Sequence, residues 1–180
     1  TGLGVKLTTL IVGASGGELW IALLLTALAS LVLGMELPTT AAYVICAAVA
    51  APALTGMGVP DLYAHLFVFW YALLCTITPP VCGNVFIAAS IAETPWLPVA
   101  GNALRLGVGL FVVPLAFIAN PALLQLAQTP LLALAAAVKI GLGLLAISYA
   151  VVGWRRARLP DALRPLALAG GLGVVFAFGF

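Results

Sequence analysis

Long apolar runs, separated by short clusters of Gly, Pro and Thr, dominate the pattern along this chain. Residues 99–118 and 131–154 each have the length of one membrane-crossing helix, because about 20 apolar residues span a hydrocarbon core of about 30 Å. A further apolar stretch, residues 166–180, predicts one more helix. The runs are continuous rather than alternating between apolar and polar positions, which predicts helices and not strands.

Two earlier runs are too long for a single crossing. Residues 19–54 would form a helix of about 54 Å, and residues 61–92 one of about 48 Å. The first run is interrupted only at residues 34–40 and the second at residues 76–80, and neither interruption is a charged loop. We therefore expect a re-entrant hairpin with two arms of about 15 residues each, followed by a broken membrane helix.

The amino-acid composition indicates which environment surrounds the folded chain. Of 180 residues, 64% are apolar and 7% are charged, whereas soluble domains are about 25% charged. So few charges cannot cover a water-facing surface, which excludes a soluble enzyme, a nucleic-acid partner and a disordered chain. The chain is predicted to be an all-α, polytopic protein of a lipid bilayer. Because it starts at Thr1 inside an apolar stretch, we expect it to be a piece of a longer protein.

The prolines at the two interruptions are expected to leave backbone carbonyls without a helical hydrogen-bond partner. A proline has no N–H, so the carbonyl four residues earlier loses its helical partner. In hydrocarbon such an oxygen must find another partner or cost several kcal/mol, an order-of-magnitude value. The prolines at the two interruptions are Pro38, Pro79 and Pro80, and the carbonyls that they are expected to free belong to Gly34, Cys75 and Thr76.

Hydroxyl groups lie beside these carbonyls, on Thr39, Thr40, Thr76 and Thr78. Carbonyl and hydroxyl oxygens suit a weakly bound alkali cation, and the helix N-terminus after each interruption suits an anion. Paired interruptions of short apolar segments are typical of the midplane site of a secondary transporter. The alternative is that each proline only kinks a span, with its carbonyl satisfied by a neighbouring helix or water.

The same segments carry a family resemblance. Residues 33–44 (LGMELPTTAAYV), 64–71 (AHLFVFWY) and 77–81 (ITPPV) resemble the large membrane subunit of TRAP transporters. More narrowly, they are similar to the fused permeases that work with TAXI-type periplasmic binding proteins. The resemblance continues through residues 103–107 (ALRLG) and 120–124 (NPALL), so it covers most of residues 1–125.

This resemblance implies an elevator-type secondary transporter in a bacterial inner membrane, driven by a sodium gradient and taking up an organic anion from its binding protein. No cofactor beyond the coupling sodium is implied. Residues 1–125 would form the second transport repeat, with C-terminal transmembrane helices in residues 126–180 and the rest of the permease as a partner. The family's ion-binding and substrate-facing positions would map onto Gly34, Pro38, Thr39, Thr40, Thr76, Thr78, Pro79 and Pro80, with sodium at Gly34, Thr40, Thr76 and Thr78.

Two positions depart from the family pattern. Glu36 stands where a small or apolar residue is expected, and Asn84 follows Cys82 and Gly83 where an Ala-rich stretch is expected. Asn84 would add a ligand to the site. A carboxylate within a membrane segment is costly, so Glu36 is read either as a cation or proton ligand or as a residue that reaches an aqueous vestibule.

Other readings compete with transport. A non-transporting assembly subunit would need no polar breaks, and an intramembrane enzyme would need a nucleophile with a base or a metal cluster. His65 follows Asp61 by one helical turn, which is read as a proton relay or, more simply, as a satisfied interfacial histidine. Lys139 is the single charge of the 131–154 span and is expected to snorkel or to pack against the helix bundle.

Overall fold

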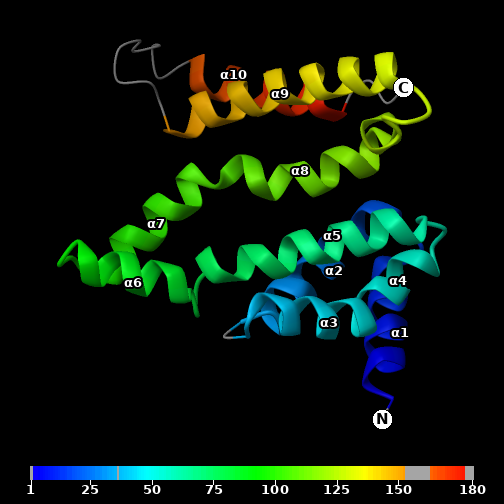
Figure 1. Cartoon of the computed structure of the whole chain (residues 1–180), viewed down its shortest axis with the longest axis horizontal. Coiled ribbons are helices and arrows are strands. Elements are labelled where there is room, and N and C mark those ends of the chain that lie inside the picture. Colours follow the sequence, from blue (N-terminus) through cyan, green and yellow to red (C-terminus); the bar gives the residue numbers. More distant parts are fainter. Residues whose placement is uncertain (1, 36, 153–162, 177–180) are drawn as a thin grey trace. The chain divides into compact units, whose positions relative to one another are not determined.

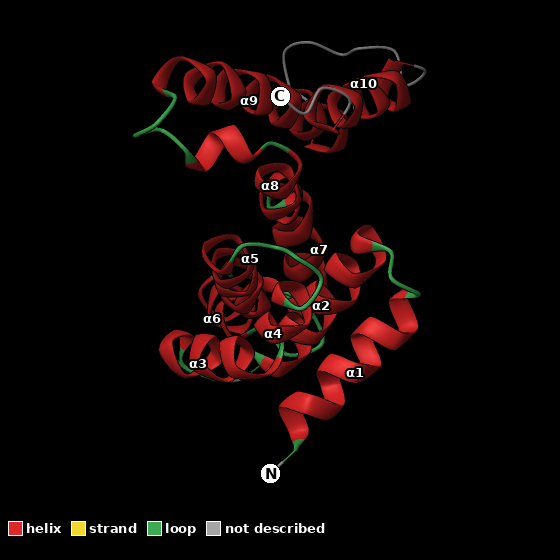
Figure 2. Cartoon of the chain, turned by 90° about the vertical axis from the view of Figure 1, so that its right-hand side faces the viewer, coloured by secondary structure: helices red, strands yellow, loops and turns green. Residues whose placement is uncertain are grey.

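Helices make up the regular structure in the described part of the chain. The computed structural model describes residues 2–35, 37–152 and 163–176. Within these ranges there is no strand (Figure 2), which confirms the predicted all-α fold class. Glu36 lies outside the described residues, and so do residues 153–162, which include the end of the predicted 131–154 span.

The chain divides into two compact units, Thr1–Gly101 and Asn102–Phe180. The N-terminal unit holds helices α1 to α6, with a 3-10 turn, η1, after α5. Their bounds are α1 Leu3–Ser15, α2 Leu19–Leu33, α3 Thr39–Val49, α4 Ala51–Thr55, α5 Asp61–Leu74, η1 Cys75–Ile77 and α6 Gly83–Ile91. Helix α7, Trp96–Leu106, runs across the division.

Helix α5 is the central element of the N-terminal unit. It packs against α2 and α3, the two arms joined by residues 34–38, which we call the hairpin connection. Figure 1 shows α3 running alongside α5 in the opposite direction. The buried side chains of α5 include Phe67, Val68 and Tyr71, because the apolar positions of this helix recur on the side that faces the two arms.

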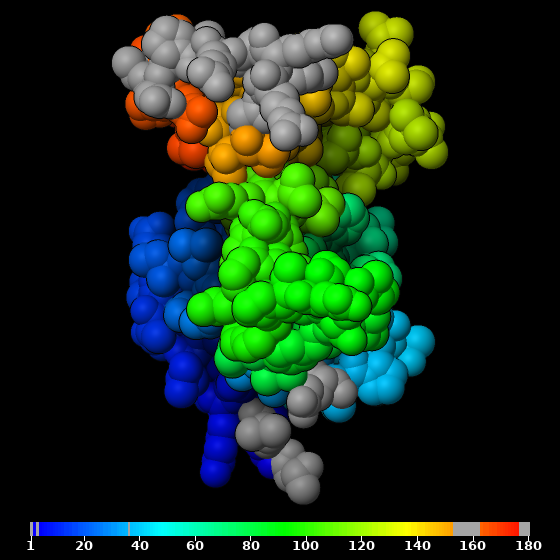
Figure 3. Space-filling model, turned by 90° about the vertical axis from the view of Figure 1, so that its left-hand side faces the viewer, coloured from blue at the N-terminus to red at the C-terminus, as the bar shows by residue number. Residues whose placement is uncertain are grey.

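Regular helix stops after α5. Residues 75–82, which we call the helix break, form η1 and an irregular stretch before α6 begins. Thr78 is extended, with φ −101° and ψ 122°, as expected for a residue that precedes proline. Figure 3 shows the green segment that includes α6 on the outside of the N-terminal unit, and the α6 side chains Phe86, Ile87 and Ile91 are exposed.

The C-terminal unit consists of α8 (Val108–Ala119), a short 3-10 turn η2 (Pro121–Leu124), α9 (Pro130–Val152) and α10 (Arg164–Phe176). Its core joins Ala116 of α8, Ile140 and Ile147 of α9 and Val175 of α10. Helices α9 and α10 approach closely at Gly143 and Gly171, where the carbonyl of Gly143 would lie 2.8 Å from a Cβ at position 171. Small residues at such a crossing let two helix backbones pack directly.

A buried polar group ties the three helices of this unit together. The side-chain amide of Asn120, 1% exposed, donates to the carbonyls of Ala116 and Val175 at 3.0 Å each. The ammonium of Lys139 donates to the Asn120 side-chain carbonyl at 2.9 Å. Of the two expectations for Lys139, packing against the bundle is therefore the one that the structure shows.

Among the residues that the structure describes, two helical stretches are long and apolar enough to cross a membrane, as judged by length and composition: Trp96–Ala119 and Pro130–Val152. They contain the predicted spans at 99–118 and 131–154, apart from residues 153–154, which lie outside the described range. The first is not one uninterrupted helix, because regular α-helix stops at Gly107 between α7 and α8. Large apolar side chains also lie exposed, such as Leu131 (84%) and Ile91 (80%).

Candidate functional site

The hairpin connection has the local structure that its sequence dictates. Helix α2 ends at Leu33, and α3 begins at Thr39 immediately after Pro38, whose φ of −54° and ψ of 141° lie outside the helical region. A proline is well placed here, because the first amides of a helix have no intrahelical acceptor. Thr39 and Thr40 form the first turn of α3 and are exposed.

The helix break carries the second group of predicted site residues. Thr76, Thr78 and Pro79 are half-buried, and Pro80 is exposed. Asn84 is the second residue of α6 and is also exposed. The break thus presents hydroxyl groups before a helix N-terminus, whereas at the hairpin the hydroxyls of Thr39 and Thr40 lie within the first turn of the following helix.

Two of the carbonyls predicted to be free are in fact paired. The Gly34 carbonyl accepts a hydrogen bond from the Leu37 amide at 3.3 Å and one from the Cys75 thiol at 3.0 Å. The Cys75 carbonyl accepts from the Thr78 amide at 3.2 Å. A carbonyl oxygen has two lone pairs, so the Gly34 oxygen is fully used in this conformation. At these positions the protein itself satisfies the oxygens, as the kinked-span alternative expects.

The threonines of the break donate to their own helix. The Thr76 hydroxyl donates to the Leu73 carbonyl at 3.0 Å, and the Thr78 hydroxyl donates to the Leu74 carbonyl at 2.7 Å. These bonds close the last turn of α5, where regular amide donors run out. A hydroxyl that donates its proton to a carbonyl keeps its oxygen lone pairs for another partner, so both oxygens can still ligate a cation.

The structure brings the two interruptions together through a residue pair that the sequence did not single out. Gly34 is buried against Cys75, and a Cβ at position 34 would lie 2.9 Å from the Cys75 sulfur. Figure 1 shows the hairpin connection and the helix break at the same end of α5.

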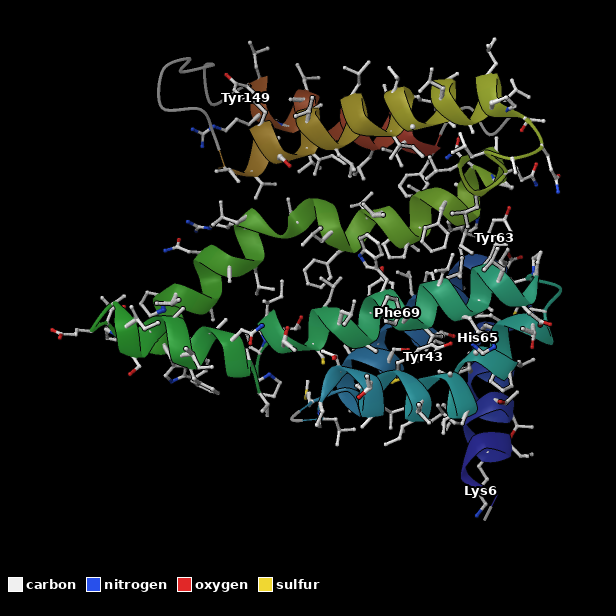
Figure 4. All side chains as sticks on the ribbon, viewed as in Figure 1. Lys6, Tyr43, Tyr63, His65, Phe69 and Tyr149 are labelled. Atoms are coloured by element: carbon white, nitrogen blue, oxygen red, sulfur yellow. The ribbon has the colours of Figure 1, made fainter. Side chains whose placement is uncertain are left out.

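The second contact between the hairpin and α5 is aromatic. The Tyr43 hydroxyl lies 3.2 Å from His65 Nδ1, and the Tyr43 ring meets Phe69 edge-on with centroids 5.4 Å apart. Figure 4 shows these three side chains between α3 and α5. Of the two readings of His65, the structure favours a satisfied histidine, which here joins one hairpin arm to the central helix.

The sequence pattern of one family matches most of this chain. Residues 1–132 match the family described as "Tripartite ATP-independent periplasmic transporter, DctM component". The chain belongs to this family. The predicted TRAP large membrane subunit is thereby confirmed, while the TAXI subtype stays a prediction.

Neither a curated relative nor a solved structure matches the chain. The DctM family match gives this chain its class: it is a permease component of a TRAP transporter, and the family is one of transporter components rather than enzymes. DctM components work with a periplasmic binding protein and a small subunit. The match ends just inside α9, so most of α9 and all of α10 lie beyond it.

Proposed function

We propose that this chain contributes to a permease of a bacterial inner membrane that uses an inward sodium gradient to take up an organic anion. The observation that carries the proposal is the contact of Gly34 with Cys75, because it places the two proline-bearing interruptions of the N-terminal unit side by side. Paired helix interruptions that meet are the usual architecture of a transporter site.

The proposed sodium ligands are the hydroxyl oxygens of Thr40, Thr76 and Thr78. Neutral oxygen ligands bind an alkali cation weakly, which permits release on the far side of the membrane. The Gly34 carbonyl, proposed from the resemblance as a further ligand, would have to give up one of its hydrogen bonds to take part. Glu36, in the hairpin connection, would add negative charge close to the cation.

The proposed anion position is the pair of helix N-termini at α3 and α6, which have 11 and 9 residues. The first amides of a helix have no intrahelical acceptor, and the helix dipole favours negative charge there. Thr39 and Asn84 lie in the first turns of these helices and can donate to a carboxylate. A bound sodium close by would favour the anion further, which is a direct route to coupling.

We further propose that residues 1–125 act as the second repeat of an elevator-type transporter, with residues 126–180 as its C-terminal helices. The partners would be the remainder of the same permease and a TAXI-type binding protein that delivers the anion. The family match supports a binding-protein partner in general and leaves the subtype to experiment.

Uptake into proteoliposomes tests this proposal. The complete permease and its binding protein would be assayed with radiolabelled lactate, succinate and glutamate as organic-anion probes. We expect at least one probe to accumulate when sodium is high outside, and not when choline replaces sodium. Equal uptake in the two salts, or no uptake of any probe, would contradict the proposal.

A further inference from the structure

The contact between the hairpin connection and the helix break is made by a thiol. Cys75, 1% exposed, lies with its sulfur 3.0 Å from the Gly34 carbonyl oxygen and 2.8 Å from the Ala72 carbonyl oxygen of α5. The single S–H is thus shared between its own helix and the hairpin. These two carbonyls belong to segments separated by about 40 residues, and the thiol is the group that joins them.

The fit depends on the lack of a side chain at position 34. A Cβ there would lie 2.9 Å from the Cys75 sulfur, 3.1 Å from the Ser30 carbonyl and 3.2 Å from the Ala72 carbonyl. Two of these three neighbours are backbone atoms, which cannot rotate away. Glycine at 34 therefore lets the hairpin connection pack directly against Cys75, and a larger residue at 34 would push the two apart.

A thiol suits a contact that opens and closes. It is a weak hydrogen-bond donor and otherwise behaves as a small hydrophobe, so separating it from a carbonyl costs less than separating a stronger donor. Thr76 directly follows Cys75, and Thr78 lies two residues after Thr76. The distance between Gly34 and Cys75 therefore sets where the first turn of α3 lies relative to the threonines of the break.

We propose that Cys75 is a positioning residue for the sodium site: its thiol docks the hairpin connection on the helix break through Gly34, and bound sodium holds this contact closed. The proposal rests on the proposed function. Cys75 is not a sodium ligand in this account, because its sulfur faces the carbonyls of Gly34 and Ala72. It acts through the threonines on either side of the contact.

Substitutions at Cys75 test this through the sodium dependence of uptake. Cys75→Ala removes the donor and should raise the sodium concentration for half-maximal uptake by about three- to tenfold, as expected for one lost hydrogen bond, with little change in the maximal rate. Cys75→Ser restores a donor of similar size and should lie closer to the unsubstituted protein. Half-saturation for Cys75→Ala equal to that of the unsubstituted protein would overturn the proposal.

Cys46 offers a matched control. Its sulfur is also buried and lies 3.6 Å from a helix carbonyl, that of Ser30, but this contact stays within the hairpin. Cys46→Ala should leave the sodium dependence unchanged. An equal change in the Cys46 and Cys75 variants would show a general packing effect and would overturn the proposed role of Cys75.

Thiol labelling gives a second readout that does not need transport. In the complete permease with Cys46 and Cys82 changed to Ala, N-ethylmaleimide should label Cys75 more slowly in sodium chloride than in choline chloride. In the companion variant that keeps only Cys46 of these three cysteines, the two salts should give the same labelling rate. Equal Cys75 rates in the two salts, or no Cys75 labelling in either, would overturn the proposal.

Failure of the proposed function and failure of the proposed role of Cys75 give different results. If uptake by the unsubstituted permease does not depend on sodium, the proposed function itself fails, whatever Cys75 does. If that uptake is driven by sodium but the Cys75 variants need the same sodium concentration for half-maximal uptake as the unsubstituted protein, only the positioning role fails.

Discussion

At the scale of single residues, several polar side chains of this protein donate to backbone carbonyls near helix ends. Thr76 and Thr78 donate to the last turn of α5, Cys75 donates across to Gly34, and Asn120 donates to the last turn of α8 and to Val175 of α10. An unpaired carbonyl in lipid or in a packed interior costs free energy, so such side chains allow a helix to stop there.

A first prediction concerns Gly34. Gly34→Ala should lower the stability of the protein in detergent by about 1–3 kcal/mol, because the added methyl group would lie 2.9 Å from the Cys75 sulfur and crowd the backbone carbonyls of Ser30 and Ala72. Thermal unfolding measures this. Gly13→Ala is the matched control, since a Cβ at that position in α1 meets nothing within 4 Å and alanine favours the helix. Equal melting temperatures for the two variants would contradict the close contact at Gly34.

At the scale of elements, close helix packing in the C-terminal unit depends on particular glycines. A Cβ at Gly143 would lie 2.5 Å from a side-chain carbon of Val175 and 2.9 Å from the Gly171 carbonyl. By contrast, a Cβ at Gly141 or Gly170 would meet nothing within 4 Å. The glycines of α9 thus divide into one that touches α10 and one that does not, although they are only two residues apart.

Gly143→Ala should therefore separate α9 from α10 and lower the melting temperature, with a cost of about 1–3 kcal/mol from overpacking. Gly141→Ala should be neutral or slightly stabilising, because it removes backbone freedom without a clash. Thermal unfolding of both variants in the same detergent makes the comparison. A Gly141→Ala variant that unfolds earlier than Gly143→Ala would show that the α9–α10 interface is placed differently.

The hydrogen bond between Asn120 and Lys139 predicts that substitutions at these two residues have coupled effects on stability. Asn120→Leu removes two donated bonds and one acceptor of Lys139, so it should cost about 2–4 kcal/mol, whereas Lys139→Met should cost less because it also removes the charge. In a double-mutant cycle the combined variant should be more stable than the sum of the two single effects indicates. If the changes in the free energy of unfolding of the two single variants simply add in the double variant, the two side chains do not interact.

Local backbone chemistry explains what the sequence could predict. Gly34, Pro38 and Pro79 act on their own few residues, so the positions where α2 and α5 end follow from the sequence alone. The contact of Cys75 with Gly34 and that of Asn120 with Val175 join residues about 40 and 55 positions apart. Such contacts depend on how helices pack. Nothing in the local sequence distinguishes Cys75 from Cys82, which is equally buried.

At the scale of the whole molecule, the candidate site and the strongest polar contact of the C-terminal helices belong to different units. The interruptions that carry the threonines lie in Thr1–Gly101, and the Asn120–Lys139 group lies in Asn102–Phe180. The family match covers the first unit completely and ends near the start of α9. Stability and ion dependence should therefore respond to different substitutions.

Lys139→Met tests this separation. It should lower the melting temperature of the complete permease while leaving the sodium concentration for half-maximal uptake within about twofold of the original, a shift smaller than that from one lost hydrogen bond. A change of tenfold or more in sodium half-saturation would place Lys139 in the ion-coupling machinery, and stability and ion dependence would then not be separate properties of the two units.

The most direct measurement is the binding of radioactive sodium to the purified complete permease, with Thr40 and Thr78 both changed to Val. Valine keeps the shape of threonine and removes the hydroxyl oxygen, so we expect saturable sodium binding to be lost. The control is Thr9→Val, because the Thr9 hydroxyl also donates to a carbonyl four residues earlier, at 2.6 Å, in a helix away from the interruptions. If the Thr40→Val and Thr78→Val double variant binds sodium with the affinity of the Thr9→Val control, the two interruptions do not form the sodium site.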